Sequence, residues 1–126
     1  VRAMSYPGGE VTSFAGHAQD GYHATGSADG TGTAASFNAP HGLAVSGNSA
    51  VLVADTNNNC IRSVTYPGGV VTTIAGGQYG YQDGTGTNAY FKNPGRVAVM
   101  PNGVAGCTVF IADHQNSRIR MVMTPQ

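Results

Sequence analysis

The stretch Val51-Leu52-Val53-Ala54-Asp55-Thr56-Asn57-Asn58-Asn59-Cys60-Ile61-Arg62 decides the fold, because the chain repeats it later as Val109-Phe110-Ile111-Ala112-Asp113-His114-Gln115-Asn116-Ser117-Arg118-Ile119-Arg120. In both copies an apolar run ends at an Asp, a polar turn follows, and the chain resumes at an Ile-Arg pair. An apolar run without polar alternation is typical of a strand that is covered on both faces. Each copy therefore predicts a buried strand, a turn and a second strand.

The repetition extends over almost the whole chain of 126 residues. Residues 1–16 return with changes as residues 61–76, and residues 29–40 return as residues 83–94, so the copies lie 54 to 60 residues apart. A period of this size is typical of propellers and solenoids, in which each unit buries its apolar faces only against its neighbours. Such folds usually need at least three units, and this chain holds about two. We therefore expect a part of a larger or assembled array.

The residues predict an all-β chain of antiparallel strands, with no helix longer than one turn. Gly or Pro interrupts nearly every window, and no stretch keeps the apolar spacing of a helix. The sequence Tyr-Pro-Gly-Gly at residues 6–9 and 66–69 lies between alternating runs and predicts two tight hairpins. Strands are expected at residues 1–6, 10–15, 41–45, 50–55, 60–66, 70–75, 96–100, 108–113 and 118–123.

Several of these motifs resemble the NHL repeat. The resemblance rests on Pro40-His41-Gly42-Leu43-Ala44-Val45, on the two long copies quoted above, and on the linking Val-Thr-Thr-Ile-Ala-Gly and Asp-Gly-Thr-Gly-Thr segments. It implies β-propeller blades of four antiparallel strands, usually six to a ring. Cys60 departs from the basic or polar residue usual in the family, and Gly95-Arg96 replaces an aromatic-Gly pair.

The resemblance also implies how the chain is divided. Residues 1–126 form an NHL-like propeller segment, with the outer hairpin of a first blade at 1–16 and a connecting loop at 17–40. A complete blade follows at 41–76, a second connecting loop at 77–94, and an incomplete third blade at 95–126. Members of the family include platforms that recognise protein or RNA, extracellular sensor domains and metal-dependent enzymes, so the fold does not settle the function.

Composition narrows the choice of partners. Charged residues make up 10% of the chain, against about 25% in ordinary domains, the formal net charge is zero and Lys92 is the only lysine. Phosphate contacts need many Lys and Arg side chains, so we expect neither nucleic acid nor an anionic membrane surface as a partner. No apolar run approaches the roughly 20 residues of a transmembrane helix, so membrane insertion is not expected. The chain begins at Val1 within a repeat, which suggests a piece of something longer.

The recurring polar residues are interpreted as structural. Asp55 and Asp113 end the apolar runs, and their carboxylates are expected to accept backbone N–H groups in the turn that follows. A catalytic or calcium-binding carboxylate is the alternative. Arg62 and Arg120 are expected to pair with the backbone or a carboxylate of a neighbouring blade, with ligand binding as the alternative.

The two Asp-Gly-Thr-Gly-Thr segments are expected to connect blades. A phosphate loop would need a following helix and usually a Lys, and an EF-hand would need acids at alternate positions and a final Glu; neither pattern is present. A calcium site at Asp29 or Asp83 is the alternative. The crossings are expected to be pinned by residues that recur at their ends: Phe37, Phe91, Pro40 and Pro94.

The histidines and cysteines give no strong site. His17 and His23 flank Asp20 at a spacing that could hold a metal, but the second repeat lacks this loop. His41 is expected near the mouth of a central channel, where metal-using relatives place ligands, yet Gly95 is its counterpart and a zinc site needs three or four ligands. We expect no metal, no cofactor and no catalytic residue. Cys60 and Cys107 occupy different repeat positions, which favours free or intermolecular thiols over an internal disulfide.

The sequence therefore predicts a non-catalytic structural or interaction module of the NHL type. Its partners would be other blades, from the same longer chain or from identical chains that self-assemble into a ring or fibre. The low charge and the high Gly and Thr content favour an extracellular or cell-surface setting. Two alternatives stay open: a fragment of a propeller enzyme of the lyase or hydrolase kind, with its catalytic groups in absent blades, and a ligand-sensing ectodomain.

Overall fold

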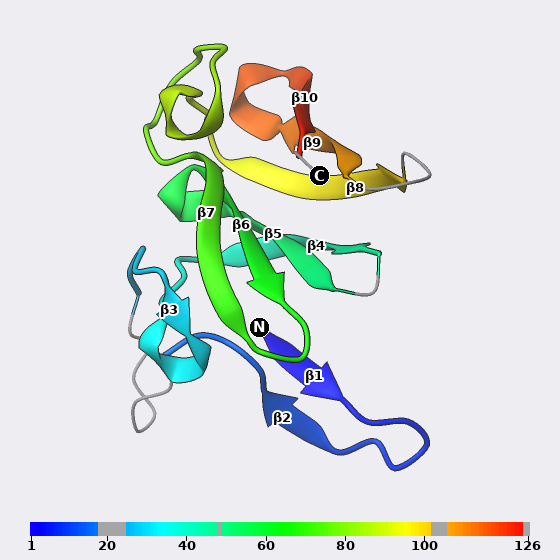
Figure 1. Ribbon diagram of the computed structural model, residues 1–126. Coiled ribbons are helices and arrows are strands. Elements are labelled where there is room, and N and C mark those ends of the chain that lie inside the picture. Colours follow the sequence, from blue (N-terminus) through cyan, green and yellow to red (C-terminus); the bar gives the residue numbers. More distant parts are fainter. Residues whose placement is uncertain (18–24, 48, 102–105, 125–126) are drawn as a thin grey trace.

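The computed structural model describes residues 1–17, 25–47, 49–101 and 106–124, and these residues form antiparallel sheets that follow one another along the molecule (Figure 1). The first sheet is a hairpin of β1 (Arg2–Met4) and β2 (Val11–Ser13). We call it the first hairpin. The fold is all-β, as the sequence predicted, and each helix in the described residues is a 3-10 helix of 3 residues.

The second sheet, the middle blade, contains β4 (Pro40–Ser46), β5 (Ala50–Asp55), β6 (Cys60–Thr65) and β7 (Val70–Gly76) in sequential order. The third sheet, the third blade, contains β8 (Pro94–Pro101), β9 (Cys107–Asp113) and β10 (Arg118–Met123). All these strand pairs are antiparallel. The expected strands are present, with ends that differ by a few residues at most.

One strand was not expected. β3 (Gly30–Thr31) lies in the first Asp-Gly-Thr-Gly-Thr segment and pairs with the outer edge of β7, so the middle sheet has five strands. The pairing is extended by a hydrogen bond from the Gly32 N–H to the Gly69 carbonyl, of 2.9 Å. The segment predicted to be a connection therefore also covers the free edge of β7, which is a common way to protect an edge strand.

Tight turns follow from residues that accept a left-handed backbone. Short 3-10 helices at Thr56–Asn58 and His114–Asn116 follow β5 and β9, and each ends at a residue with positive φ, Asn59 at 54° and Ser117 at 52°. In this way the chain reverses within four residues and begins β6 or β10 beside the strand that it has just left.

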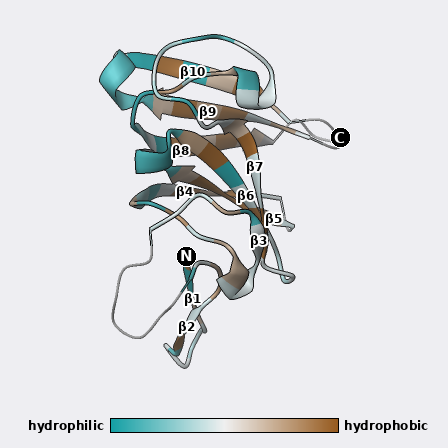
Figure 2. Ribbon diagram, turned by 90° about the vertical axis from the view of Figure 1, so that its left-hand side faces the viewer, coloured by the Kyte–Doolittle hydropathy of each residue, from teal (hydrophilic) through white to brown (hydrophobic). Residues whose placement is uncertain are grey.

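Two apolar clusters hold the sheets together. Leu52, Ala54 and Ile61 of the middle blade pack with residues of the third blade and of the segment before it, including Phe91, Val109 and Ile111. Val53, Val64 and Val71 point to the other side and pack with Ala15, Ala35 and Phe37. β5 is thus covered on both faces, which explains its continuous apolar sequence. Figure 2 shows hydrophobic residues concentrated on the strands of these stacked sheets.

β4 and β8 approach most closely at Gly42. A Cβ atom at this position would lie 2.6 Å from the Cα of Arg96 and 2.8 Å from the carbonyl oxygen of Gly95. Only glycine therefore fits where the first strand of the middle blade meets the first strand of the third. The absence of a side chain here sets the spacing between the two blades.

Candidate functional site

The buried Arg62 is the centre of a charged cluster in the middle blade. Its guanidinium donates to Asp55 Oδ2 and to Asp29 Oδ1, both at 2.8 Å, and to the carbonyls of Ser36 and Ala28. The side chains of Arg62 and Asp55 are both fully buried, whereas that of Asp29 is half exposed. The ring of Phe37 lies 5.0 Å from the guanidinium carbon. A buried charge needs such partners, because an isolated one would be very costly. Both terminal nitrogens of the guanidinium are paired, whereas the buried Nε has no hydrogen-bond partner among the described residues.

The Asp55 carboxylate also fixes the chain on either side of it. Its Oδ1 accepts the backbone N–H of Asn38, and its Oδ2 accepts the Asn58 side chain, both at 2.8 Å. One bond reaches back into the connecting segment and the other reaches the turn that follows β5. The cluster therefore ties the connection before the blade to the blade itself.

The third blade repeats this arrangement. Arg120 donates to Asp113 Oδ2 at 3.0 Å and to Asp83 Oδ1 at 2.6 Å, and it lies 5.0 Å from the ring of Phe91. Asp113 Oδ1 accepts the backbone N–H of Lys92 at 2.8 Å. Because the same network occurs in two equivalent sheets, we interpret it as part of the structure of the blade.

The partners of the arginines differ from the expectation in one respect. Arg62 and Arg120 were expected to reach a neighbouring blade, but their carboxylate partners come from their own blade and from the connection that precedes it. The turn expected to satisfy Asp55 and Asp113 contributes only an Asn side chain to each. In the middle blade the β3 edge pairing brings the connecting segment and Asp29 against β7. In the third blade Asp83 reaches Arg120 without such a pairing among the described residues. Pro40 and Pro94 begin β4 and β8, directly after these connections.

Asp29 and Asp83, the alternative calcium ligands, are both engaged by arginine. Burial alone would raise the pKa of the Asp29 carboxyl, but hydrogen bonds from the Thr73 N–H and hydroxyl and from Arg62 outweigh it and lower that pKa. Among the described residues no group of three or more His, Cys, Asp or Glu side chains is placed to hold a metal ion.

The histidines do not converge on a common centre in the part of the chain that the structure describes. His17 Nδ1 lies 3.1 Å from the Thr33 carbonyl oxygen, while Asp20 and His23 lie outside the described residues. His41 lines a cavity of about 500 Å³ together with Arg96 and His114, where β4 and β8 begin. The sequence did not single out His114, because it sits in a polar turn with no repeated partner.

The two thiols are free and buried. Burial raises the pKa of Cys60 to about 12, and the nearby Asp55 carboxylate acts in the same direction. The Cys107 sulfur lies 3.1 Å from the Ser46 hydroxyl and 3.3 Å from the Thr124 hydroxyl. A thiolate is the reactive form of cysteine, so Cys60 is placed as an inert packing residue.

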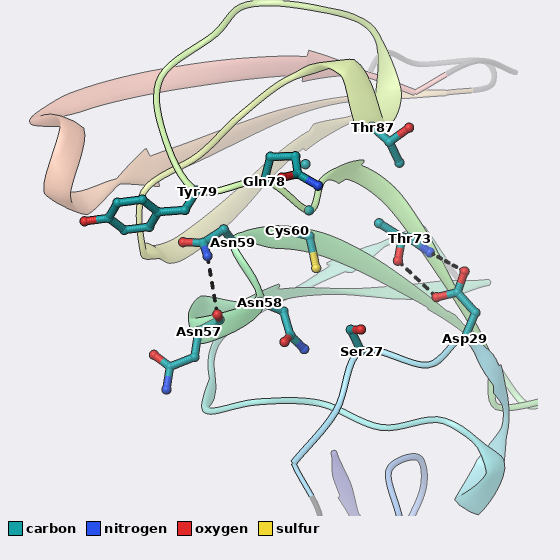
Figure 3. A pocket seen from close by; sticks show the side chains of 12 residues that line it. Ser27, Asp29, Asn57, Asn58, Asn59, Cys60, Thr73, Gln78, Tyr79 and Thr87 are labelled. Atoms are coloured by element: carbon teal, nitrogen blue, oxygen red, sulfur yellow. Dashed lines mark hydrogen bonds between the residues drawn. The ribbon is translucent and has the colours of Figure 1, made fainter.

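A polar cleft of about 650 Å³ opens beside Cys60, between the end of the middle blade and the segment that leads to the third (Figure 3). Its walls come from four places in the chain: the segment before β3, the turn between β5 and β6 with the start of β6, strand β7, and the connection after β7. The lining residues are Ser27, Asp29, Asn57, Asn58, Asn59, Cys60, Thr73, Gly76, Gly77, Gln78, Tyr79 and Thr87. Sequence reasoning missed this cleft, because no single motif contains it.

The outer face of the third blade is apolar and exposed. Ile119, Met121 and Met123 alternate along β10 with half-buried residues and are 72%, 59% and 71% exposed. Phe110 lies directly opposite Met121 in the strand pairing and is 37% exposed. We call these four residues, with Met100 of β8, the outer apolar face.

Comparisons with known proteins agree with the repeat and the fold. Residues 37–62 match the family model of the NHL repeat. No curated protein matches the chain in sequence. Among solved structures, an auxiliary nutrient binding protein from Bacteroides thetaiotaomicron is 28% identical with a TM-score of 0.72, over 95% of this chain and 31% of that chain.

Two further structures show the fold alone. An auxiliary nutrient binding protein from Bacteroides ovatus is 23% identical, with a TM-score of 0.71 over 99% of this chain and 32% of that chain. A putative phosphatase from Bacteroides thetaiotaomicron is 22% identical, with a TM-score of 0.75 over 99% of this chain and 30% of that chain. The chain thus spans less than a third of the length of each of these structures. It carries an NHL repeat at residues 37–62, and its fold is all-β, built of antiparallel sheets.

Proposed function

We propose that this segment is a non-catalytic structural and interaction module whose outer apolar face binds another propeller blade. The observation that carries the proposal is the contrast between repeat positions in the two blades. Ile61 and Leu52 of the middle blade are 0% and 2% exposed, because the third blade packs on them. Their counterparts Ile119 and Phe110 are 72% and 37% exposed. Large exposed apolar patches mark interaction sites or aggregation liabilities.

The opposite end of the segment offers the complementary surface. Leu43 and Val45 of β4 are 55% and 68% exposed, on the face that points away from the third blade. Their counterparts Val97 and Val99 of β8 pack against the cluster that joins the two blades. The β4 face with Leu43 and Val45 therefore corresponds to the surface that packs on a preceding blade, and the outer apolar face corresponds to the surface on which a following blade packs. Such head-to-tail contacts produce rings if the rotation closes and filaments if it does not.

The source of the next blade is either the same longer polypeptide or an identical chain. In the second case the third blade of one chain and the first hairpin of the next chain would form a single blade. Strands β1 and β10 would then compete for the same position in that blade. Both strands are repeat counterparts of β6, and β1 pairs with β2 in the register that β6 uses with β7. Assembly of identical chains into a ring or fibre therefore requires that one of these two strands leave its place.

The remaining features support binding without catalysis. Each recurring carboxylate and arginine is engaged in an ion pair with another member of the same cluster, which supports a structural role. Similarity to the nutrient binding protein at 28% identity also supports a binding role. Likeness to the putative phosphatase is a likeness of fold and lends no support to the enzyme alternative. None of the helices in the described part of the chain has the length or apolar character to span a bilayer. An extracellular setting, based on low charge, remains part of the proposal.

Methionine oxidation tests the proposal. Met121 and Met123 are exposed in the single segment, so mild peroxide should convert both to sulfoxides at low protein concentration. At high concentration, or within a longer parent polypeptide, a docked blade should protect them. Mass spectrometry of tryptic peptides would report both states. Equal oxidation of Met121 and Met123 in every one of these samples would show that the outer apolar face is not an interface.

A further inference from the structure

The polar cleft beside Cys60 has the dimensions of a small-molecule site. Its volume of about 650 Å³ falls within the range of roughly 300–1,000 Å³ that is common for ligand pockets. It lies away from the outer apolar face, since its walls are the middle blade and the two connecting segments. A ligand could therefore occupy it whether or not another blade is docked.

The charges around the cleft exclude two classes of ligand. No Lys, Arg or His lines it, so it lacks the cations with which proteins bind phosphates and carboxylates. Its only carboxylate, Asp29, is bound to Arg62 at 2.8 Å and to Thr73 at 3.0 Å and 3.2 Å. A calcium ion needs six to eight oxygen ligands and usually several carboxylates. The cleft therefore suits an uncharged ligand.

Three polar side chains of the cleft are free to bind a ligand. Ser27, Gln78 and Thr87 line it, and within the described residues their side chains make no hydrogen bond. Hydroxyl and amide groups both donate and accept hydrogen bonds. Ligand hydroxyl groups do the same, so a polyhydroxylated molecule is the natural complement of these three side chains.

The wall that faces them is already fixed. Asn58 donates to Asp55 at 2.8 Å and to the Gly26 carbonyl at 2.7 Å, and the Asn59 side chain donates to the Asn57 carbonyl at 3.3 Å. The Asn59 side chain also accepts the backbone N–H of Asn93 at 3.0 Å. A wall held in this way loses little conformational entropy when a ligand binds.

An aromatic ring completes the cleft. Tyr79 stands at the rim opposite Asp29 and Thr73 (Figure 3), and its side chain is 61% exposed. The Lys92 ammonium group lies 5.1 Å from the ring centroid. The Tyr79 hydroxyl donates to Gln115 Oε1 at 3.5 Å, so the exposed ring is held in place and offers an apolar platform for the C–H face of a pyranose.

We propose that this cleft is a binding site for a neutral carbohydrate. Ser27, Gln78 and Thr87 hydrogen-bond the sugar hydroxyls, and the Tyr79 ring packs against one sugar ring. Weak binding is expected, because the cleft is open and supplies few direct contacts.

Saturation-transfer NMR with maltose, cellobiose and lactose tests the proposal, because this method detects millimolar binding. We expect transfer to at least one of these neutral disaccharides. Tyr79→Ala and Gln78→Leu should each weaken binding on the order of tenfold, the value of one lost contact of about 1.4 kcal/mol. Controls are Tyr6→Ala, a ring 96% exposed in the first hairpin, and Thr33→Val, the repeat counterpart of Thr87 outside the cleft. Both should bind as the original chain does.

The variants must first give the β-sheet circular dichroism spectrum of the original chain. Absence of transfer to all three disaccharides would overturn the proposal. Unchanged binding in folded Tyr79→Ala and Gln78→Leu would overturn it as well. Ile119→Lys should leave sugar binding unchanged, so that failure of blade docking and failure of the carbohydrate site are distinguishable.

Discussion

Ile61 and Ile119 occupy the same position of the repeat, but Ile61 is fully buried and Ile119 is 72% exposed. Their strands do not explain the difference, because Ile61 pairs with Ala54 and Ile119 with Ala112 in the same register. The cause is the neighbouring sheet, which covers Ile61 and has no counterpart over Ile119 among the described residues.

This contrast predicts that the same Ile→Ala substitution destabilises the fold much more at position 61 than at position 119. Ile61→Ala should lower the free energy of unfolding by about 2–5 kcal/mol, because it leaves a cavity in the cluster between the blades. Ile119→Ala should change it by no more than about 0.5 kcal/mol in the unassociated chain, as for an ordinary surface site. Urea denaturation at low protein concentration measures both. Similar losses for the two variants would show that the outer apolar face is covered within the chain itself.

Removal of one partner from the buried cluster should strongly lower the free energy of unfolding. Asp55→Ala leaves the Arg62 guanidinium buried with only the half-exposed Asp29 as its counter-ion. Breaking a buried pair in this way costs about 3–5 kcal/mol, which urea denaturation would detect. Asp83→Ala is the matched control, since that side chain is 79% exposed and surface pairs contribute at most about 1 kcal/mol. If Asp55→Ala proved as stable as Asp83→Ala, the structural role of the cluster would be wrong.

Asp29 should contribute a pH-dependent part of the stability. Its pKa is lowered in the folded chain from an ordinary value of 3.8. A carboxyl with a lowered folded-state pKa stabilises the fold above its unfolded-state pKa, and this contribution is lost as the pH falls through the folded-state value. The loss therefore occurs below about pH 3.8. Asp29→Asn should lose less stability than the original chain between about pH 5 and about pH 2 in urea titrations; an identical loss would contradict the assignment.

Both thiols should resist modification in the folded chain. Cys60 is 3% exposed with a pKa of about 12, and Cys107 is 4% exposed. The thiolate is the nucleophile, so Ellman's reagent at pH 8 should release almost no chromophore from the native chain and two equivalents in denaturant. Rapid reaction of one thiol without denaturant would mean that its strand opens readily.

Much of the fold could be predicted because the sequence repeats itself. The apolar run 50–55 and the Tyr-Pro-Gly-Gly turns specify strands through local pattern, and their recurrence specifies stacked sheets. β3 could not be predicted, because Gly30 and Thr31 carry no apolar pattern and are held only by the distant edge of β7. The Asp29–Arg62 pair could not be predicted either, because the two residues are far apart in sequence and no local pattern joins them. The polar cleft collects residues from four separate parts of the chain, so no local motif could indicate it.

Sedimentation velocity over a concentration series tests the central claim that the outer apolar face docks another blade. The untagged chain should associate as its concentration rises, and Ile119→Lys should shift the association to higher concentration or abolish it while the β-sheet circular dichroism spectrum stays the same. A charged side chain at the centre of an apolar contact would be buried without a partner, which is strongly unfavourable. A single soluble, folded monomer of 12.8 kDa for the original chain at every concentration would contradict the claim.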